Sequence, residues 1–392
     1  MEHIFILGSH PAWSVAEIAA VLGNKNLFWH DETILLVKDI DFNVDNLIKN
    51  LGGVLKIAII EERIAINTSF IGLAKSISKI IISKAKRGQG KLVFGISDQG
   101  LGGRFQAEKI GLQAKKELNN LGVSSRLVTS KEKTLSTVIV GQNKLLSKGT
   151  ELILYQDGAD IAIARTLAIQ DYKDLSRRDY GRPSRDDRSG MLPPKLAQIM
   201  INLARPEELN GLILDPFCGS GTIITEAMLM GYPNLMGTDL SEKAINDSRV
   251  NAEWIRDLYK LETKPKFYIK NASRLVQFFK PNTVAAIISE PYLGPQRGLS
   301  DLPLILRELE DLYNQSLTAF YQIMKPRARA IMVWPVFFGK HYLQLNLDKW
   351  RLIDPLPDNL INSQKFKISP RQTLLYSRPG QKVWRELIIL EK

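Results

Sequence analysis

From residue 211 onward, short apolar runs alternate with longer stretches in which apolar residues recur every three or four positions. The short runs predict buried strands, and the longer stretches predict helices with one apolar face. Strands are predicted at 212–215, 235–239, 267–270, 284–289 and 330–334, and helices at 195–204, 222–230, 241–257 and 301–324. This alternation favours a parallel sheet covered by helices, in which ligands bind at the carboxyl ends of the strands.

The two ends of the chain show other patterns. Residues 372–376 and 382–390 predict two strands of an antiparallel hairpin at the edge of the sheet. Residues 1–170 contain both short apolar runs and stretches with apolar residues every three or four positions. Strands are predicted at 4–7, 33–37, 54–61, 91–96, 125–128, 137–140, 152–155 and 160–168, and helices at 14–22, 72–86 and 105–121. Residues 171–190 hold five aspartates and six lysines or arginines, with few apolar residues. They predict a loop that joins domains or flanks an active site.

Charge is distributed unevenly along the 392 residues, whose net charge is +12 with a sequence pI near 9.5. Nearly all of the excess lies between Gly72 and Thr150, where there are 15 lysines and arginines and only four acidic residues. A basic segment attached to a nearly neutral remainder is typical of a nucleic-acid-binding surface. Lysine-rich helices with a solvated face are the alternative. The candidate RNA contacts are Lys84, Lys86, Arg87, Arg104, Lys115 and Lys116.

Several other classes of protein are disfavoured by composition. No apolar run reaches 18 residues, so no membrane span is expected, and the N-terminus lacks the basic start of a signal peptide. The single cysteine, Cys218, excludes an internal disulfide and fits a reducing, cytoplasmic compartment. Cys218 and the four histidines show no metal-ligand spacing, so no metal is expected. Cys218 is either a small residue filling a loop, which the sequence favours, or a reactive thiol.

A glycine-rich turn follows the strand predicted at 212–215. Its residues are Asp215, Pro216, Phe217, Cys218, Gly219, Ser220, Gly221 and Thr222, and a helix is predicted to start there. Glycines allow the backbone to approach a ligand closely. The turn lacks the Gly-Lys-Ser/Thr ending of a triphosphate loop and the glycine spacing of a dinucleotide loop. We therefore expect it to bind a different nucleotide-like cofactor.

An acidic residue ends the next predicted strand. Asp239, followed by Leu240, lies 24 residues after Asp215. A carboxylate at this strand end is typical of a group that binds ribose hydroxyls. The alternative is that Asp239 only caps the following helix, a role that Ser241 is equally able to fill.

The most informative stretch is Ser289-Glu290-Pro291-Tyr292, which follows the apolar run 284–288. Pro291 lacks an N–H group and pushes Glu290 towards an extended conformation. The Ser289 side chain and the Glu290 carbonyl then offer two acceptors at one strand end, and Tyr292 offers a flat face. This set suits a planar base that carries an exocyclic amine, so these four residues are the catalytic candidates. The alternative for Tyr292 is an aromatic residue of the core.

The glycine turn, the acidic strand end and this loop, in that order, resemble those of S-adenosylmethionine-dependent amino-methyltransferases. Along nearly its whole length the chain resembles the THUMP-domain tRNA guanosine-10 N2-methyltransferases. The matching residues are Ile6-Leu7-Gly8, Ala16-Glu17-Ile18, Gln170-Asp171-Tyr172, Arg177-Arg178-Asp179, Arg182-Pro183, the segments 190–197, 202–204 and 215–222, and the tail 376–381.

The resemblance implies an α/β fold with four parts. They are an α+β ferredoxin-like domain at 1–65, a THUMP RNA-binding domain at 66–170, a linker at 171–194 and a Rossmann-like class I methyltransferase domain at 195–392. It further implies S-adenosylmethionine as the cofactor, tRNA as the partner, and methylation of the guanosine N2 amine. A DNA amino-methyltransferase and a catalytically inactive tRNA-binding protein are the alternatives, and a small activator protein is a partner that the sequence leaves open.

Two positions depart from the family pattern. The family usually has Asp-Pro-Pro-Tyr where this chain has Ser289-Glu290-Pro291-Tyr292, so a weaker acceptor replaces a carboxylate and an acid replaces a proline. The acid expected after the third strand is also absent. Asn271 and Ala272 stand there instead, as candidates to bond the adenine amine of the cofactor. Asp179, in the linker motif, is a candidate contact to the base or the cofactor.

Overall fold

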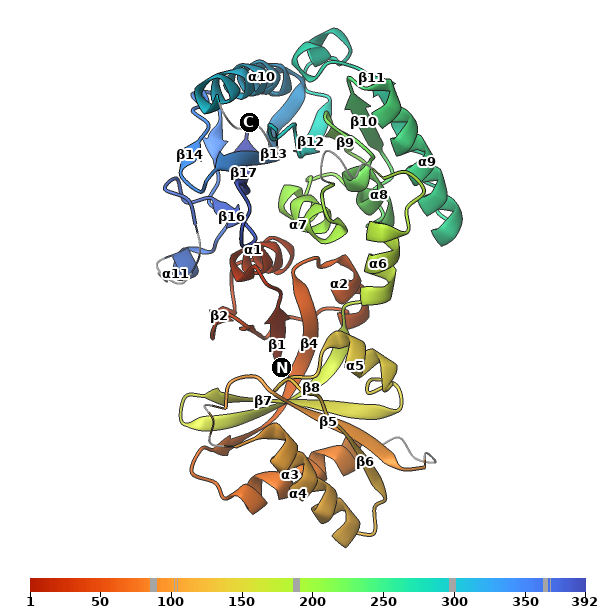
Figure 1. Ribbon diagram of the computed structural model, residues 1–392, viewed down its shortest axis with the longest axis vertical. Helices are drawn as coiled ribbons and strands as arrows, with labels where there is room; N and C mark the ends of the chain where they lie inside the picture. The colour runs from red at the N-terminus through yellow and green to blue at the C-terminus, as the bar shows by residue number, and fades with distance from the viewer. Residues whose placement is uncertain are drawn as a thin grey trace. The chain divides into compact units, whose positions relative to one another are not determined.

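The computed structural model of the protein describes residues 1–84, 90–101, 103, 105–185, 191–295, 301–361, 366 and 368–392. These residues form two compact units, each with its own sheet (Figure 1). The first unit holds Met1–Ser9, Lys25–Lys49 and Val54–Tyr172, and the second holds His10–Asn24, Asn50–Gly53 and Lys173–Lys392. Within the described ranges, no helix combines the length and the apolar character needed to cross a membrane.

The first unit is built on an eight-stranded sheet in the order β2-β3-β1-β4-β8-β7-β5-β6. Its strands are β1 (Glu2–Leu7), β2 (Leu27–Trp29), β3 (Ile34–Lys38), β4 (Val54–Ala65), β5 (Leu92–Asp98), β6 (Ser125–Val128), β7 (Gly149–Asp157) and β8 (Asp160–Ile169), and its helices include α2 (Val44–Asn50), α3 (Phe70–Lys84), α4 (Ala107–Asn120) and α5 (Thr137–Gln142). Helices α3 and α4 share one apolar core with β5, β7 and β8, formed by residues such as Leu73, Ile110 and Phe94.

The second unit contains a sheet in the order β11-β10-β9-β12-β13-β17-β15, with β14 paired to β13 and β16 paired to β17. The strands are β9 (Leu212–Asp215), β10 (Leu235–Asp239), β11 (Lys266–Ile269), β12 (Val284–Ser289), β13 (Met324–Phe337), β14 (His341–Tyr342), β15 (Arg351–Leu352), β16 (Leu374–Tyr376) and β17 (Val383–Glu391). Strands β11, β10, β9, β12 and β13 are parallel, and β17 runs antiparallel to β13 and β16. The predicted parallel sheet and C-terminal hairpin are therefore confirmed.

Helices cover this sheet, whose central strand β12 is buried at every position. The helices of this unit are α1 (Pro11–Leu22), α6 (Tyr172–Tyr180), α7 (Pro194–Ala204), α8 (Thr222–Leu229), α9 (Glu242–Tyr259), α10 (Leu302–Ile323), the short α11 (Asp358–Ile361) and the 3-10 helix η1 (Ala272–Gln277). Among them, α7, α8 and α9 pack directly on the strands, and α1 packs on α7. The strand order reverses between β9 and β12. Open parallel sheets bind ligands at the carboxyl edge beside such a reversal, which here is formed by Asp215 and Ser289.

Helix α1 groups with the second unit, although it lies near the start of the chain. The indole N–H of its buried Trp13 donates to the Leu375 carbonyl at 3.3 Å. The carboxylate of its buried Glu17 accepts hydrogen bonds from the backbone N–H groups of Gly52 and Gly53, both at 2.8 Å, and from the Asn202 amide at 2.7 Å. Residues 10–24 are thus an integral part of the unit that carries the glycine turn.

Two local predictions were wrong. The β-branched run 137–140 was predicted as a strand but forms helix α5, because the Ser136 hydroxyl caps it by accepting from the Ile139 N–H and its one buried residue, Val140, joins an apolar cluster. Residues 171–190 were predicted as a loop, but 172–180 form helix α6. This helix buries Leu175 and Arg178 on one face, and the buried charge is balanced by ion pairs to two carboxylates.

Candidate active site

A cavity of about 560 Å³ lies in the second unit, where the strand ends of β9, β10, β11 and β12 meet. Residues from all the predicted motifs line it: Asp215, Pro216, Phe217, Cys218, Gly219, Ser220, Thr222, Asp239, Leu240, Asn271, Ala272, Glu290, Pro291 and Tyr292. Of the predicted turn and loop residues, Gly221 and Ser289 do not line the cavity. Three charged residues that the sequence prediction missed, Lys243, Asp247 and Lys270, do line it. Lys270 directly follows β11, so the strand-end rule would have identified it.

The glycine turn owes its shape to two left-handed residues. Gly219 has φ = 51° and Gly221 has φ = 84°, a region that disfavours other residues. A Cβ atom on Gly221 would also lie 3.0 Å from the Ser248 hydroxyl oxygen. Side chains of α9 hold the turn from behind, since Ser248 donates to the Gly219 carbonyl at 2.7 Å and Asn251 donates to the Ser220 carbonyl at 2.9 Å. The turn is therefore fixed before any ligand binds.

Cys218 fits the prediction of a small residue filling the turn. It is buried, and burial raises the pKa of its thiol, so it stays protonated at neutral pH. A protonated thiol is a poor nucleophile and a poor metal ligand. Among the residues that the structure describes, no group of three or more His, Cys, Asp or Glu side chains is arranged to hold a metal ion.

Asp239 joins the glycine turn to the end of β10. One carboxylate oxygen accepts from the Gly219 N–H at 3.1 Å, and the other accepts from the Ser241 N–H at 2.9 Å. Ser241, and not Asp239, caps helix α9 through the Ala244 N–H. Each carboxylate oxygen has more than one lone pair, so Asp239 retains acceptor capacity towards the cavity that it lines.

Asn271 is oriented differently from the expectation. Its side-chain oxygen accepts from both the N–H and the hydroxyl of Ser273, at 2.9 Å each, and so caps helix η1. Both lone pairs of that oxygen are thereby used. The oxygen needed to accept from an adenine amine is thus committed to the turn, which leaves the amide nitrogen of Asn271 as the side-chain group that can donate to a ligand.

Ser289 links the two central strands beneath the cavity. It is fully buried at the end of β12, and its hydroxyl donates to a carboxylate oxygen of Asp215 at 2.7 Å. Burial raises the pKa of Asp215 to about 7, against the hydrogen bonds from Ser289 and the Phe217 N–H, which favour the charged form. Because the Ser289 hydrogen points to Asp215, the lone pairs of its oxygen are directed elsewhere. Direct contact between this oxygen and a substrate base stays a prediction.

The next residues of the loop lie at the cavity itself. Tyr292 is 59% exposed, so its interpretation as a core aromatic is wrong. Its backbone carbonyl accepts from the hydroxyl of buried Tyr313 at 3.1 Å, which anchors the loop while leaving the ring free to meet a ligand. The Glu290 carboxylate pairs with Arg385 of β17, whose Nε lies 2.5 Å from Oε1. This gives the unexpected acid of the loop a fixed partner.

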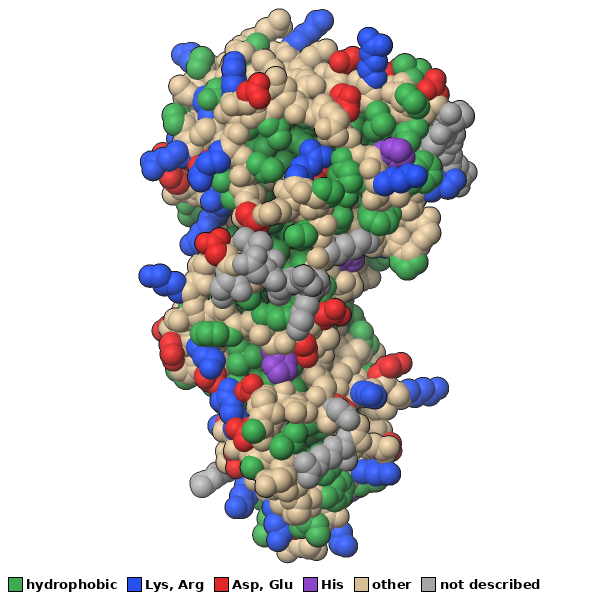
Figure 2. All heavy atoms as spheres, turned by 90° about the vertical axis from the view of Figure 1, so that its left-hand side faces the viewer, with side chains coloured by type: hydrophobic (Ala, Val, Ile, Leu, Met, Phe, Trp, Pro, Cys, Tyr) green, Lys and Arg blue, Asp and Glu red, His purple; other side chains and the backbone are tan. Residues whose placement is uncertain are grey.

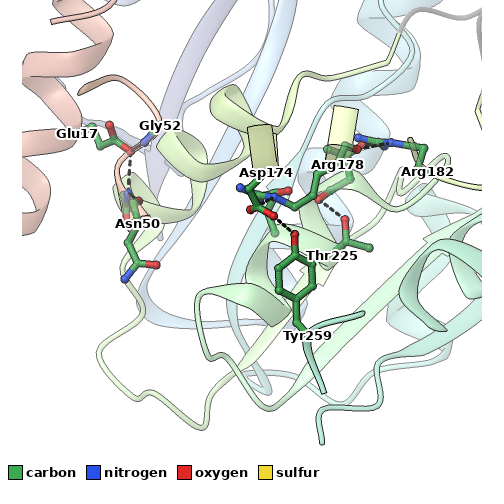
Figure 3. A network of polar contacts seen from close by, with 11 residues as sticks. Glu17, Asn50, Gly52, Asp174, Arg178, Arg182, Thr225 and Tyr259 are labelled. Carbon is green, nitrogen blue, oxygen red and sulfur yellow. Dashed lines mark hydrogen bonds and ion pairs between the residues drawn. The ribbon is translucent and has the colours of Figure 1, made fainter. Parts of the chain in front are cut away.

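Helix α6 and the residues after it support the glycine turn. Buried Arg178 bonds Glu226 of α8 and also Asp174, at 3.1 Å, and Asp174 accepts in turn from the Tyr259 hydroxyl (Figure 3). Arg182 donates to the Thr222 hydroxyl at 2.6 Å. The sequence prediction missed this role because it treated the segment as a loop. Asp179, the candidate contact from this segment, is half-buried and does not line the cavity.

The candidate RNA contacts lie in the first unit or outside the described residues. Lys115 is half-buried and Lys116 is exposed, both on α4, and Lys84 forms an ion pair with Glu61 at 3.0 Å. Lys86, Arg87 and Arg104 lie outside the described residues. Figure 2 shows Lys and Arg side chains gathered, with few acidic ones, over the end of the first unit that α3 and α4 form.

Comparison with known proteins agrees with this geometry. Residues 182–336 match the family model UPF0020, described as an RMKL-like methyltransferase domain. The chain is 29% identical over 159 residues to a tRNA (guanine(10)-N2)-dimethyltransferase from Pyrococcus abyssi, and 29% identical over 139 residues to one from Methanocaldococcus jannaschii. These alignments cover 40% and 34% of this chain and only 41% and 39% of the relatives. The resemblance predicted from the sequence is thereby confirmed over residues 182–336.

Two solved structures share the fold along essentially the whole chain. TrmN from Thermus thermophilus has a TM-score of 0.55 at 16% identity and covers all of both chains. A possible methylase from Clostridium difficile 630 has a TM-score of 0.51 at 14% identity, covering 99% of this chain and 97% of its own. Likeness at such identities shows the fold alone, and it confirms an α/β methyltransferase fold with mixed sheets.

Proposed function

We propose that this chain is an S-adenosylmethionine-dependent methyltransferase that methylates the exocyclic N2 amine of a guanosine in tRNA, at position 10. One observation carries the proposal. Exposed Tyr292 and the two residues before it line the same cavity as the glycine turn and Asp239. The cavity thus joins a place for a flat base to a place for a nucleoside cofactor. The named relatives from Pyrococcus abyssi and Methanocaldococcus jannaschii support the choice of amine and RNA.

The residues present fit S-adenosylmethionine. The turn at 219–221 can approach a ligand closely because its glycines carry no side chain, and Asp239 offers carboxylate lone pairs for ribose hydroxyls. Leu240, 64% exposed at the cavity, offers an apolar face to the adenine ring, and the Asn271 amide nitrogen offers a donor to a ring nitrogen. When bound, the cofactor supplies an electrophilic methyl group.

The loop at 289–292 would prepare the amine. The lone pair of the guanine amine is delocalised into the ring, so the protein must hold the amine hydrogens and turn the lone pair towards the methyl donor. The Glu290 carbonyl and the Ser289 oxygen, whose own hydrogen is directed to Asp215, are the proposed acceptors. Preorganised acceptors also stabilise the positive charge that develops on nitrogen. Tyr292 would stack on a base swung out of its helix.

The first unit would bind the RNA. We assign residues 1–65 as a ferredoxin-like domain, 66–170 as a THUMP domain and 171–194 as the linker, with tRNA as the partner in a cytoplasmic setting. The concentration of basic residues between 72 and 150 supports this assignment, since phosphate contacts by Lys and Arg dominate RNA affinity. Lys115 and Lys116 lie next to each other on α4 and are available to test it.

The proposed activity is tested by supplying the protein with labelled S-adenosylmethionine and unmodified tRNA, with duplex DNA in a parallel reaction. We expect label in N2-methylguanosine after the tRNA is digested to nucleosides. Label in DNA instead would favour a DNA amino-methyltransferase. Tight tRNA binding with no transfer to either substrate would favour an inactive tRNA-binding protein.

Asp239→Ala is expected to weaken S-adenosylmethionine binding about 10-fold or more, because a hydrogen bond to a charged group is worth roughly 1.5–3 kcal/mol. Calorimetry measures the affinity. Asp247→Ala, which removes another carboxylate at the same cavity, is the matched control and should change the affinity much less. Equal losses in the two variants would show that Asp239 contributes only general charge.

Lys115→Ala with Lys116→Ala is expected to flatten the dependence of tRNA affinity on salt. Removing one lysine–phosphate interaction lowers the slope of log K against log salt by roughly 0.7–0.9. Different tRNAs should be affected alike, because phosphate contacts carry little sequence information. The matched control is Lys264→Ala with Lys266→Ala, two exposed lysines of the second unit. If both pairs flatten the slope equally, the basic segment has no special part in RNA binding.

A further inference from the structure

Glu290 is the residue by which this catalytic loop differs most from the Asp-Pro-Pro-Tyr pattern, and its side chain forms a mostly buried ion pair with Arg385. Its carboxylate accepts from two nitrogens of one guanidinium: Arg385 Nε to Oε1 at 2.5 Å, and Nη2 to Oε2 at 3.4 Å. The side chains of Glu290 and Arg385 are only 10% and 14% exposed. A two-point contact in a mostly dry setting fixes orientation as well as distance.

Arg385 is itself held firmly. It lies near the start of β17, opposite Pro335 of β13 on one side and Tyr376 of β16 on the other. Its guanidinium lies 6.0 Å from the centroid of the Tyr376 ring. That ring stacks on His10, with 4.1 Å between centroids, and meets the edge of Trp13 at 5.9 Å. The loop is thus tied, through one arginine, to the C-terminal strands and to helix α1 of the same unit.

Both carboxylate oxygens of Glu290 accept from the same Arg385 guanidinium, so the pair fixes the direction of the Glu290 side chain. The pair therefore acts on the conformation of the loop.

The replacement of the family's proline by Glu290 also removes a restriction on the backbone conformation of the loop. A proline at position 290 would fix φ through its ring, whereas a glutamate leaves φ free to rotate. Order must then come from contacts, and the Glu290–Arg385 pair provides one at the residue whose carbonyl is a proposed acceptor for the amine. Small displacements of such a group are costly, since a misplacement of 1 Å can reduce a rate by about 100-fold.

We propose that Arg385 is a positioning residue for methyl transfer. By holding the Glu290 side chain, it fixes the backbone between Ser289 and Tyr292 and takes over the role of the missing proline. The inference rests on the proposed function, because the loop it positions is the proposed amine-binding loop. Arg385 is not among the described residues that line the cavity, and it reaches the loop through the Glu290 side chain.

The test compares four variants of the full chain: Arg385→Gln, Arg385→Lys, Glu290→Gln, and the double Glu290→Gln with Arg385→Gln. Arg378→Gln is the matched control. Arg378 lies over the same Tyr376 ring, at 5.9 Å, but is exposed and bonds the Tyr376 hydroxyl instead of Glu290. For each variant, calorimetry gives the S-adenosylmethionine affinity, and a single-turnover assay gives the rate of methyl transfer to tRNA.

We expect Arg385→Gln to slow single-turnover transfer by roughly 30- to 100-fold, with cofactor affinity within about 3-fold of the wild type. Intact cofactor binding shows that the variant is folded. Arg385→Lys should recover part of the rate, because it restores charge without the two-point geometry. The double variant should be no slower than the slower single variant, as expected for two residues that act as a unit. Arg378→Gln should transfer at nearly the wild-type rate.

The inference is overturned if Arg385→Gln transfers normally, if it loses cofactor affinity in parallel with rate, or if Arg378→Gln is equally slow. These results require only that the wild type is active. A wild type that binds S-adenosylmethionine but methylates no tRNA would overturn the proposed function, and this inference with it. If the wild type is active and Arg385→Gln transfers methyl groups at the same rate, this inference fails while the proposed function stands.

Discussion

Replacing Tyr292 by alanine is expected to lower kcat/KM for tRNA methylation by about 100-fold while leaving the affinity for S-adenosylmethionine nearly unchanged. Stacking of a base on an aromatic side chain is worth roughly 1–3 kcal/mol. The ring is exposed at the cavity and its backbone is anchored by Tyr313, so it is free to make this contact. Steady-state kinetics with tRNA and calorimetry with the cofactor separate the two effects.

Two controls define the role of the Tyr292 ring. Tyr292→Phe keeps the flat face and should retain most of the activity. Tyr268→Ala removes another exposed tyrosine, on β11 and outside the cavity lining, and should change neither quantity by more than about 2-fold, as is usual for surface substitutions. A Tyr292→Ala variant that lost cofactor affinity as strongly as turnover would show that the ring contacts the cofactor instead of the base.

The sheet of the second unit could be predicted from the sequence because apolar residues are spaced differently in its strands and in its helices. Strands at 212–215, 235–239 and 284–289 were predicted with the bounds that the structure has. A fully buried parallel strand needs an unbroken apolar run, and no helix of that length would be stable alone. The strand-end rule then located the cavity, because carboxyl ends of parallel strands share one edge.

Local propensity misled the prediction where tertiary contacts decide the outcome. The run 137–140 is rich in β-branched residues, yet a side-chain cap and burial of one face make it helix α5. Helix α6 has a polar sequence, and its buried Arg178 is acceptable only because Asp174 and Glu226 lie beside it. Both cases depend on particular side-chain contacts, from nearby Ser136 and Asp174 and from Glu226, 48 positions from Arg178, and periodicity does not report such contacts.

Many of the residues that line the cavity were named from the sequence, but their hydrogen-bond partners were not. The Ser289 hydroxyl donates to Asp215, because strand β9 lies next to β12 and brings the two side chains together. The Asn271 oxygen was expected to meet adenine and instead caps η1. Arg385, 95 positions from Glu290, carries no local signal at all. Such partners follow from strand order, which a single sequence specifies only through the complete fold.

Among single substitutions, Glu17→Ala is expected to have the largest effect on stability. Glu17 is fully buried on α1, and its carboxylate is the acceptor for the N–H groups of Gly52 and Gly53 and for the Asn202 amide. A buried donor left without a partner costs roughly 1–3 kcal/mol. We therefore expect the free energy of unfolding of the second unit to fall by about 3 kcal/mol or more. Removal of residues 1–170 should be more damaging still, because it deletes α1 altogether.

Urea unfolding followed by tryptophan fluorescence measures this loss, because five of the six tryptophans lie in the second unit. Glu207→Ala removes an exposed glutamate of the same unit and should cost no more than about 0.5 kcal/mol. If the two variants unfold alike, the contacts of Glu17 do not hold α1 in place.

The pH dependence of stability gives a second, independent measure of Glu17. Burial raises the pKa of Glu17 to about 7, despite three donors that favour the charged form. An unfolded glutamate has a pKa near 4.3, so between about pH 4.3 and 7 the folded state binds more protons than the unfolded state at this residue. Its contribution to stability is therefore fully present below about pH 4.3 and is lost as pH rises through 7.

The isosteric variant Glu17→Gln cannot titrate. We expect the free energy of unfolding of the wild type, minus that of Glu17→Gln, to fall by up to about 3 kcal/mol from pH 5 to pH 8. A difference that stays constant over this range would mean that Glu17 is already ionised at pH 5 and is held by its donors alone.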